Sequence, residues 1–235
     1  MTDATVTLQP AFVLQQRNYR ETSLIIEVLT RDYGRLSVLA KGVRKLKSKT
    51  AGLLQPFVPL LISYVGKAEL KTLTAVEMAE PFGKLSGLAL YCGFYINELI
   101  GCFLHKYDPH PDVFDQYQAC VVSLATEAQL EPALRTFELD LLDSVGYGLH
   151  SDIDDAHQFS QSQAYVFDAE RGLVASAQGP YSVHTLQAIQ RRCFNDPKTL
   201  SQTKMLMRQV IDTHLQGKRL KSRTVINKLL KQTEQ

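Results

Sequence analysis

Short apolar runs recur through the first third of the chain, and residues 35–40 alternate between polar and hydrophobic with the period of two that marks a half-buried β-strand. Five such runs are separated by polar or glycine-containing segments, and they cover residues 11–14, 24–29, 35–40, 57–64 and 70–77. Gly34 ends the short loop between the second and third runs, which is typical of a β-hairpin. Five short strands predict a small Greek-key barrel of the OB type, with an SH3-like barrel as the alternative.

The hydrophobic period changes to that of a helix near residue 80. Residues 87–104 are apolar on nearly all sides, which predicts a buried helix. One further helix is predicted to begin at Pro111 or Asp112, and others are predicted to cover 131–145, 183–192 and 201–215. The last predicted helix follows Ser222, which is a suitable N-cap. The least regular part is 149–181, where 164–168 and 172–176 predict a small hairpin. The predicted fold is α+β, with a five-stranded OB-type barrel over 1–80 and an α-helical C-terminal domain over 81–235.

The composition is that of an ordinary globular protein. No apolar run reaches the roughly 18 residues of a membrane span, and the N-terminus shows no secretory pattern, so we expect a cytoplasmic protein without a membrane partner. The chain has four cysteines and no C-x-x-C pair. We expect Cys92, Cys102, Cys120 and Cys193 to be buried free thiols in a reducing compartment.

The net charge near zero conceals an uneven distribution. Residues 1–80 carry eleven Lys and Arg against seven Asp and Glu, which gives +4. Residues 81–203 carry seven against fifteen, which gives −8, and residues 204–235 carry eight against two, which gives +6. Basic ends around an acidic middle indicate a polyanionic partner, and we expect the two ends to share one face.

A dense basic run follows the third predicted strand, and no Asp or Glu occurs from Arg35 through Ala68. We interpret 35–41 as a barrel strand, 42–49 as a mobile basic loop, and 218–223 as a second cluster before a helix N-terminus, where backbone N–H groups favour anions. The alternatives are a solvated loop and a frayed tail. The predicted DNA contacts are Arg35, Lys41, Arg44, Lys45, Lys47, Lys49, Lys218, Arg219, Lys221 and Arg223. Aromatic residues near the strands that suit base stacking are Tyr19, Tyr33, Phe57 and Tyr64, with core packing as the alternative.

The sequence contains none of the common catalytic or nucleotide-binding motifs. His150 and His157 lie in an acidic segment, but their spacing fits no common zinc pattern. Asp140 and Asp143 share a helix face without a partner base or nucleophile. We therefore expect no catalysis, no metal and no cofactor.

Arg135 stands apart as a basic residue in the acidic middle of the chain. It accompanies Leu134, Leu139 and Leu142 on a predicted helix. Such a surface can seat a short acidic-hydrophobic peptide, with the arginine binding a carboxylate. The alternative is an intrahelical ion pair with Glu131 or Glu138.

The chain resembles the RecO family of bacterial recombination mediators in six segments, which occur in the family's order. They are residues 33–35, 40–44, 54–57, 95–99, 137–147 and 220–223. The resemblance implies an OB fold, a helical C-terminal domain, binding of single- and double-stranded DNA, and annealing of complementary strands in the cytoplasm at the nucleoid. It also implies that the protein acts with RecR to help RecA displace the single-strand-binding protein SSB.

The resemblance further implies that the helical domain binds the C-terminal tail of SSB, and Arg135 matches a family arginine implicated in that contact. Many members of the family carry a four-cysteine zinc site after the Gly-Tyr motif. Residues 148–180 contain no cysteine, so that zinc site is absent here. Two other functions stay open, which are an RNA-binding module and a protein-interaction scaffold whose basic loop binds an acidic partner.

Overall fold

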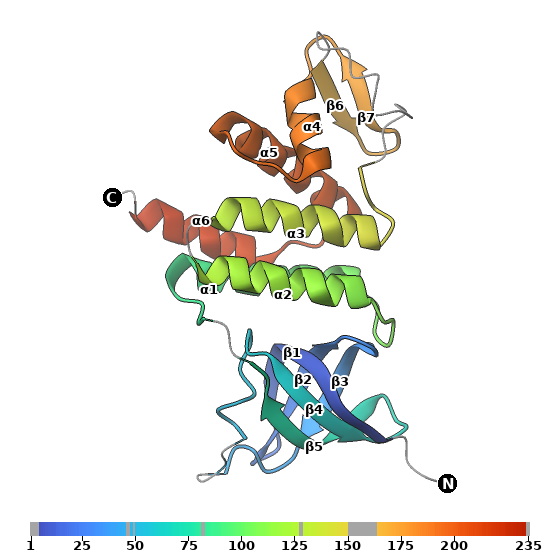
Figure 1. Ribbon diagram of the computed structural model, residues 1–235, viewed down its shortest axis with the longest axis vertical. Helices are drawn as coiled ribbons and strands as arrows, with labels where there is room; N and C mark the ends of the chain where they lie inside the picture. Colours follow the sequence, from blue (N-terminus) through green and yellow to red (C-terminus); the bar gives the residue numbers. More distant parts are fainter. Residues whose placement is uncertain are drawn as a thin grey trace. The chain divides into compact units, whose positions relative to one another are not determined.

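The protein is described from a computed structural model, which describes residues 5–45, 48, 50–80, 83–126, 129–149 and 164–233 (Figure 1). Contacts divide the chain into two compact units. The first comprises Met1–Ala128 together with Ser222–Gln235, and the second is Gln129–Lys221. The first unit thus combines the barrel with helices from the part of the chain that follows residue 80.

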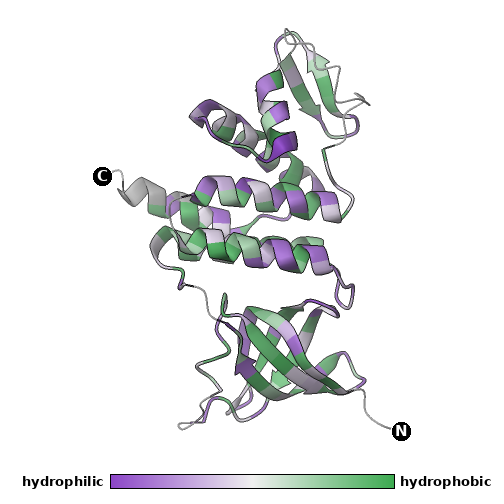
Figure 2. Ribbon diagram, viewed as in Figure 1, coloured by the Kyte–Doolittle hydropathy of each residue, from purple (hydrophilic) through white to green (hydrophobic). Residues whose placement is uncertain are grey.

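Five strands close a barrel in the first unit, and they confirm the OB-type prediction. They are β1 (Thr5–Tyr19), β2 (Ser23–Thr30), β3 (Gly34–Ala40), β4 (Leu60–Val65) and β5 (Leu70–Met78). The order around the barrel is β1-β2-β3-β5-β4, and only the β3–β5 pair is parallel. Alternate residues such as Val28, Val38 and Ile62 fill the interior without exposure to solvent, and Figure 2 shows the hydrophobic stretches of these strands.

The bounds of two strands differ clearly from the sequence prediction, and β1 already begins at Thr5 instead of residue 11. β1 continues to Tyr19, because its exposed polar residues 15–18 still pair with β2, and the hydrophobic pattern does not mark that extension. β4 begins only at Leu60. Phe57 has a positive φ of 68° and packs against Phe94 with ring centroids 5.3 Å apart, so its segment is a turn and not a strand.

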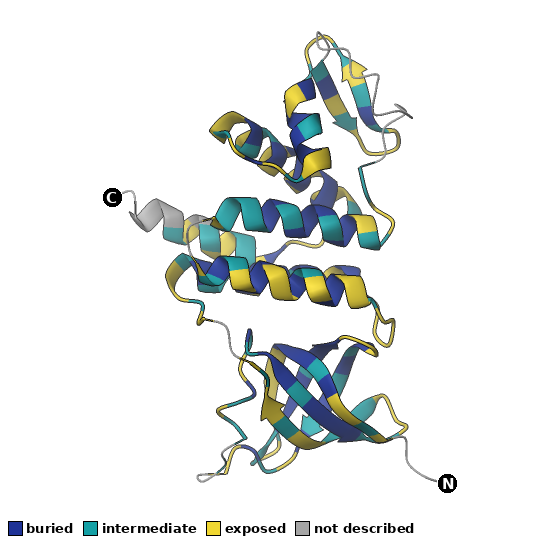
Figure 3. Cartoon of the chain, in the orientation of Figure 1, coloured by how far each residue is buried: buried dark blue, intermediate teal, exposed yellow. Residues whose placement is uncertain are grey.

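Helices α1 (Gly87–Phe103) and α2 (Pro111–Ala125) begin and end close to their predicted bounds and pack against the barrel. Phe12 points out of the barrel, with its ring centroid 5.4 Å from that of Phe114 and 5.0 Å from that of Tyr117. Asn97 Nδ2 donates to the Leu14 carbonyl at 2.9 Å and its Oδ1 accepts from the Tyr117 hydroxyl at 2.6 Å. The outer surface of β1 is therefore covered, and Figure 3 shows buried positions along the barrel strands and both helices.

The connection between α1 and α2 is fitted closely to the β2–β3 turn. Gly34 has a φ of +66°, and a Cβ atom there would overlap the backbone carbonyl of Asp108. Arg31 Nε and Nη2 pair with the two carboxylate oxygens of Asp115 at 3.2 and 3.0 Å, and this pairing lowers the pKa of Asp115. Barrel and helices thus form one closely packed unit.

Helix α6 (Lys221–Thr233) returns to the first unit. It begins one residue before the predicted N-cap Ser222, so Ser222 lies inside the helix and that prediction was wrong. Glu98 Oε2 on α1 accepts from the backbone N–H of Ser222 at 2.9 Å and from its hydroxyl at 2.5 Å. A carboxylate from another helix therefore performs the capping role.

The second unit contains α3 (Leu130–Ser144), the strands β6 (Ala164–Asp168), β7 (Gly172–Ser176) and β8 (Tyr181–Ser182), α4 (Val183–Arg191) and α5 (Pro197–His214). The predicted β6–β7 hairpin is confirmed, and the two-residue β8 adds a third strand. Helix α5 starts four residues earlier than predicted. Asp196 accepts from the Thr199 N–H at 2.9 Å and Pro197 occupies the first turn, a start signal that precedes the apolar pattern.

The four cysteines, all within the described part of the chain, form no disulfide, as predicted, but only two are buried. Cys92 and Cys120 lie inside the helical packing, whereas Cys102 and Cys193 are exposed, which corrects the prediction for those two. The acidic segment that contains His150 and His157 lies outside the described residues. Within the described part of the chain, no helix is both long and apolar enough to cross a membrane.

Candidate nucleic-acid interface

The start of the basic loop is fixed to the barrel rather than free. Val43 is 5% exposed and belongs to the barrel core. On either side of it, the side chains of Lys41, Arg44 and Lys45 are exposed. The Arg44 backbone N–H donates to the Thr22 carbonyl at 2.9 Å. The described part of the predicted mobile loop is therefore a defined turn that presents cations outward.

A second segment brings another cation to the same end of the barrel. The β1–β2 turn contains Arg20, which is exposed, and Arg44 Nη1 donates to the Arg20 carbonyl at 3.2 Å. Arg17 is also exposed near the end of β1, and Glu21 is the acidic residue of the turn. We call Arg20, Lys41, Arg44 and Lys45 the basic surface. Its positive charges come from two segments of the chain that are about twenty residues apart.

Arg35 occupies a different environment from the other predicted DNA contacts. Its side chain is 13% exposed, and its Nε lies 3.1 Å from Glu27 Oε1. Its Nη1 donates to the Gly101 carbonyl at 2.5 Å. The Arg35 guanidinium therefore joins β3 to α1, and a role in DNA binding stays an untested prediction.

The tail cluster is divided between two environments. Lys218, Arg219 and Lys221 are exposed. Arg223 is half-buried, with its Cζ 5.6 Å from the centroid of the Tyr95 ring. The sequence predicted anion binding at the start of α6, and the carboxylate of Glu98 already occupies that position. Two further predicted contacts, Lys47 and Lys49, lie outside the described residues.

The four aromatic candidates for base stacking are not equally accessible. Phe57 and Tyr64 are 7% and 3% exposed and pack in the interior, which is the alternative the sequence left open for them. Tyr33 is 45% exposed and meets Tyr64 edge to face at a centroid distance of 6.1 Å. Tyr19 is half-buried next to Arg20, so only Tyr19 adjoins the basic surface.

In the second unit, Arg135 is engaged by its own helix. It is 5% exposed, its Nη2 contacts Glu138 Oε1 at 2.6 Å, and its Nη1 lies 4.0 Å from Glu131 Oε2. The intrahelical pair is thus the alternative that the structure shows. Leu134, Leu139 and Leu142 are all buried.

A cavity of about 320 Å³ lies beside α3 and α4 in the second unit. Of the residues predicted to contact the peptide, Leu139 lines this cavity. Leu186 and Ile189 of α4 contribute further apolar surface, and Arg192 contributes a guanidinium. Arg192 Nε lies 2.8 Å from Asp140 Oδ1, and Arg192 Nη2 also pairs with Asp143. Asp140 and Asp143 therefore act as partners of Arg192 in structural ion pairs.

Comparison with known proteins identifies the family. The family model described as "Recombination protein O N terminal" matches residues 2–82, and "Recombination protein O C terminal" matches residues 85–224. The chain is 41% identical over 222 residues to the DNA repair protein RecO of Methylococcus capsulatus, covering 93% of this chain and 92% of the relative. It is 41% identical over 231 residues to that of Nitrosococcus oceani, covering 95% and 94%. The chain belongs to the RecO family.

Membership of the RecO family gives this protein a role in DNA repair and recombination. In this RecO protein, the residues that sequence reasoning missed are Arg17, Arg20 and Arg192. Arg17 and Arg20 are isolated cations at the end of a strand whose extension the hydrophobic pattern does not mark. Arg192 follows the end of α4, and only the fold brings it to α3.

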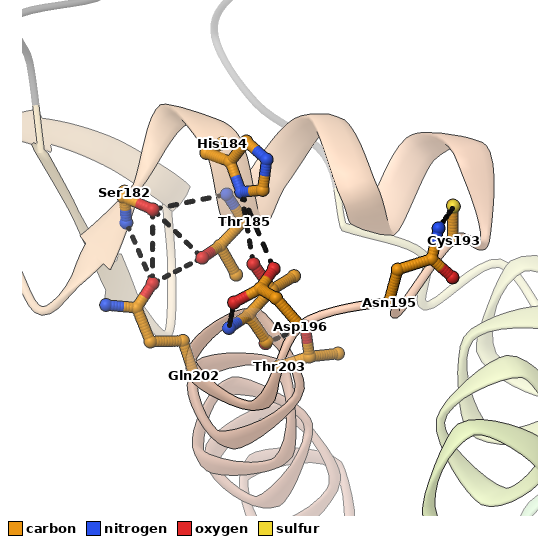
Figure 4. Close-up of polar contacts among 9 residues, drawn as sticks. Ser182, His184, Thr185, Cys193, Asn195, Asp196, Gln202 and Thr203 are labelled. Carbon is orange, nitrogen blue, oxygen red and sulfur yellow. Dashed lines mark hydrogen bonds and ion pairs between the residues drawn. The ribbon is translucent and has the colours of Figure 1, made fainter. Parts of the chain in front are cut away.

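A serine, a histidine and an aspartate also come together in the second unit of this RecO protein, as Figure 4 shows. The Ser182 hydroxyl accepts from the Thr185 N–H at 3.2 Å and donates to Gln202 Oε1 at 3.2 Å. His184 Nδ1 lies 3.1 Å from the Thr199 hydroxyl. Asp196 caps α5 as Ser182 caps α4. These contacts are those of two adjacent helix caps.

Proposed function

We propose that this protein is a non-enzymatic DNA-binding protein that anneals complementary single strands during recombinational repair. The observation that carries the proposal is the convergence of Arg20 with Lys41, Arg44 and Lys45, joined by the Arg44–Thr22 backbone hydrogen bond. Clustered exposed cations neutralise phosphates and lower the repulsion between two strands. Such a mechanism requires no nucleotide hydrolysis, no metal and no cofactor.

Within the same proposal, the protein acts on DNA covered by SSB, together with RecR, and helps to load RecA. The family membership supports this part, and the basic surface supplies the contact with DNA. Single- and double-stranded DNA both carry the phosphates that the surface neutralises, so both are expected ligands. The cytoplasm, next to the nucleoid, is the compartment in which such a protein would work.

The test is strand annealing without ATP, using complementary oligonucleotides coated with SSB. We expect wild type to accelerate annealing and the Arg20→Ala/Arg44→Ala/Lys45→Ala variant to lose most of that acceleration. The matched control is Lys67→Ala/Lys84→Ala, which removes exposed cations of the first unit outside the basic surface. Equal annealing by the triple variant and wild type would overturn the proposal. Competition between DNA and RNA of one sequence separates it from an RNA-binding function, which predicts a preference for RNA.

A second function, binding of the acidic-hydrophobic tail of SSB, is supported by the cavity beside α3 and α4. The cavity offers apolar side chains, including Leu139 and Ile189, next to the Arg192 guanidinium. A peptide that ends in an apolar residue and a free carboxylate has matching chemistry. The Asp143 side chain is 51% exposed and competes for Arg192. We therefore assign the carboxylate contact to Arg192 in preference to the buried Arg135.

Binding of an SSB tail peptide, followed by fluorescence anisotropy, tests this second function. Ile189→Glu places a negative charge in the cavity and should abolish binding, whereas Val166→Glu changes an exposed residue of β6 and should not. Asp143→Asn should strengthen binding, because it frees Arg192 from a competing carboxylate. Normal peptide affinity of the Ile189→Glu variant would exclude the cavity. Intact DNA binding by that variant would show that the two surfaces are separate.

A further inference from the structure

An open depression of about 770 Å³ lies between the β1–β2 turn and the loop that follows β3. Tyr19, Arg20 and Glu21 are among the residues that line it from the turn, and Leu39, Lys41 and Lys45 line it from β3 and the loop. An aromatic ring, an aliphatic side chain, three cations and one carboxylate thus meet in one concave surface, and cations outnumber the carboxylate.

The Arg20 guanidinium lies over one face of the Tyr19 ring, so the two flat groups form a stacked pair that a nucleobase can extend. The Arg20 Cζ lies 5.2 Å from the centroid of the Tyr19 ring. Unpaired nucleobases stack both on aromatic rings and on guanidinium planes. Lys41 and Lys45 line the same depression as this stacked pair and are suited to the phosphates on either side of a stacked base.

The packing of the first unit directs a strand toward this depression. OB barrels commonly bind single strands across the outer face of the second and third strands. In this protein the outward Leu29 on β2 is 1% exposed, and the outward Arg35 on β3 is held by the Gly101 carbonyl of α1. That part of the face is therefore occupied by the protein's own helix, whereas the depression beyond it stays open.

We propose that the depression binds one or more unpaired nucleobases of a single strand, which stack on Tyr19 and Arg20, while Lys41 and Lys45 contact the flanking phosphates. This inference rests on the proposed function and adds a base-binding site to it. A double helix keeps its bases inside the stack, so it meets only the cations here. Single strands thus gain a contact that duplex DNA and a strand without bases both lack.

The absence of tryptophan from the chain allows a direct test. The Tyr19→Trp variant carries a single indole in the depression, and stacking of a base quenches indole fluorescence. The probes are oligo(dT) of about 25 nucleotides and an abasic strand of the same length and charge. The matched control is Tyr33→Trp, which places the indole at an exposed tyrosine in the β2–β3 turn.

We expect oligo(dT) to quench Tyr19→Trp, the abasic strand to leave it almost unchanged although bound, and Tyr33→Trp to respond to neither. Equal effects of both probes on Tyr19→Trp, or no quenching while oligo(dT) is bound, would overturn the base site and leave DNA binding intact. Failure of the wild-type protein to bind either probe would overturn the proposed function as well.

The second measurement is the affinity of the Tyr19→Leu and Tyr19→Phe variants for the two probes. Tyr19→Leu should lose about tenfold in affinity for oligo(dT) and much less for the abasic strand, because it removes the ring on which a base stacks and keeps all the cations. Tyr19→Phe keeps the ring and should behave as wild type. A Tyr19→Leu protein that binds oligo(dT) as tightly as wild type would contradict the stacking role.

Discussion

The backbone N–H of Arg44 donates to the carbonyl oxygen of Thr22 at 2.9 Å. This bond joins the loop after β3 to the β1–β2 turn and brings together cations that are far apart in the sequence. Because Val43 anchors the loop in the barrel core, the backbone that carries these cations has a defined position on the barrel. A surface of this kind can bind phosphates with little loss of backbone conformational entropy.

Arg20 has a φ of +51°, a left-handed conformation that costs a residue with a Cβ atom about 1 kcal/mol. Arg20→Gly should therefore raise the free energy of unfolding by up to about 1 kcal/mol while weakening DNA binding. Chemical denaturation and DNA titration measure the two effects. Leu8→Gly is the control, because Leu8 is exposed with a φ of +48° and lies outside the basic surface. Unchanged DNA affinity of Arg20→Gly would contradict its place in the interface.

Position 34 requires glycine because its φ is positive and because the backbone of Asp108 approaches it closely. Gly34→Ala should cost more than about 3 kcal/mol in the free energy of unfolding, because the backbone of the α1–α2 connection must move. Gly42→Ala shares the positive φ of +69° but would place its Cβ 3.7 Å from the Lys45 side chain, so we expect a loss of only about 1 kcal/mol. Similar losses for the two variants in denaturant unfolding would refute the close approach.

The Arg135–Glu138 ion pair is buried, so we expect its loss to lower the free energy of unfolding more than it changes peptide binding. Glu138 is 1% exposed, so Arg135→Ala removes the 2.6 Å partner of a buried carboxylate and should cost about 3–5 kcal/mol. Arg135→Met/Glu138→Leu removes both charges and should recover most of that loss. Thermal or denaturant unfolding measures both variants. If Arg135→Ala were as stable as wild type, the structural role of the pair would be wrong.

His214 gives the second unit a dependence on pH. Its ring stacks on Tyr147 with centroids 4.2 Å apart, and burial lowers the pKa of His214 below its ordinary value of 6.5. The unfolded chain therefore binds the proton more readily, so the stabilising contribution is complete above pH 6.5 and is lost as the pH falls toward the folded-state pKa. Relative to His214→Phe, which keeps an aromatic ring, wild type should lose stability as the pH falls through and below the ordinary histidine pKa of 6.5. A difference in unfolding free energy that is constant over this range would contradict the assignment.

The sequence predicted the barrel because period-two patterns describe strands with one buried face. It did not predict that α1 and α2 would cover the outer surface of the barrel. Phe12 and Leu29 look like ordinary strand residues, and only the three-dimensional packing shows that they face helices. The start of α5 was missed for another reason, since Asp196 and Pro197 precede the apolar pattern by several residues.

The candidate site could be predicted only in part. Lys41, Arg44 and Lys45 stand out as a dense run, but charge density does not reveal whether a cation is exposed. Arg35 belongs to the same run and is committed to Glu27 and Gly101. Arg20 is isolated in the sequence and joins the surface through the hairpin geometry and the hydrogen bond to Arg44.

The most direct test of the basic surface is the salt dependence of its affinity for single-stranded DNA. For the Arg20→Ala/Lys41→Ala/Lys45→Ala variant we expect weaker binding and a slope of log K against log salt that is smaller by about 2, since each lost phosphate contact contributes roughly 0.7 on a single strand. The Lys67→Ala/Lys84→Ala control should keep the wild-type slope. An unchanged slope and affinity in the triple variant would show that this surface is not where the protein binds DNA.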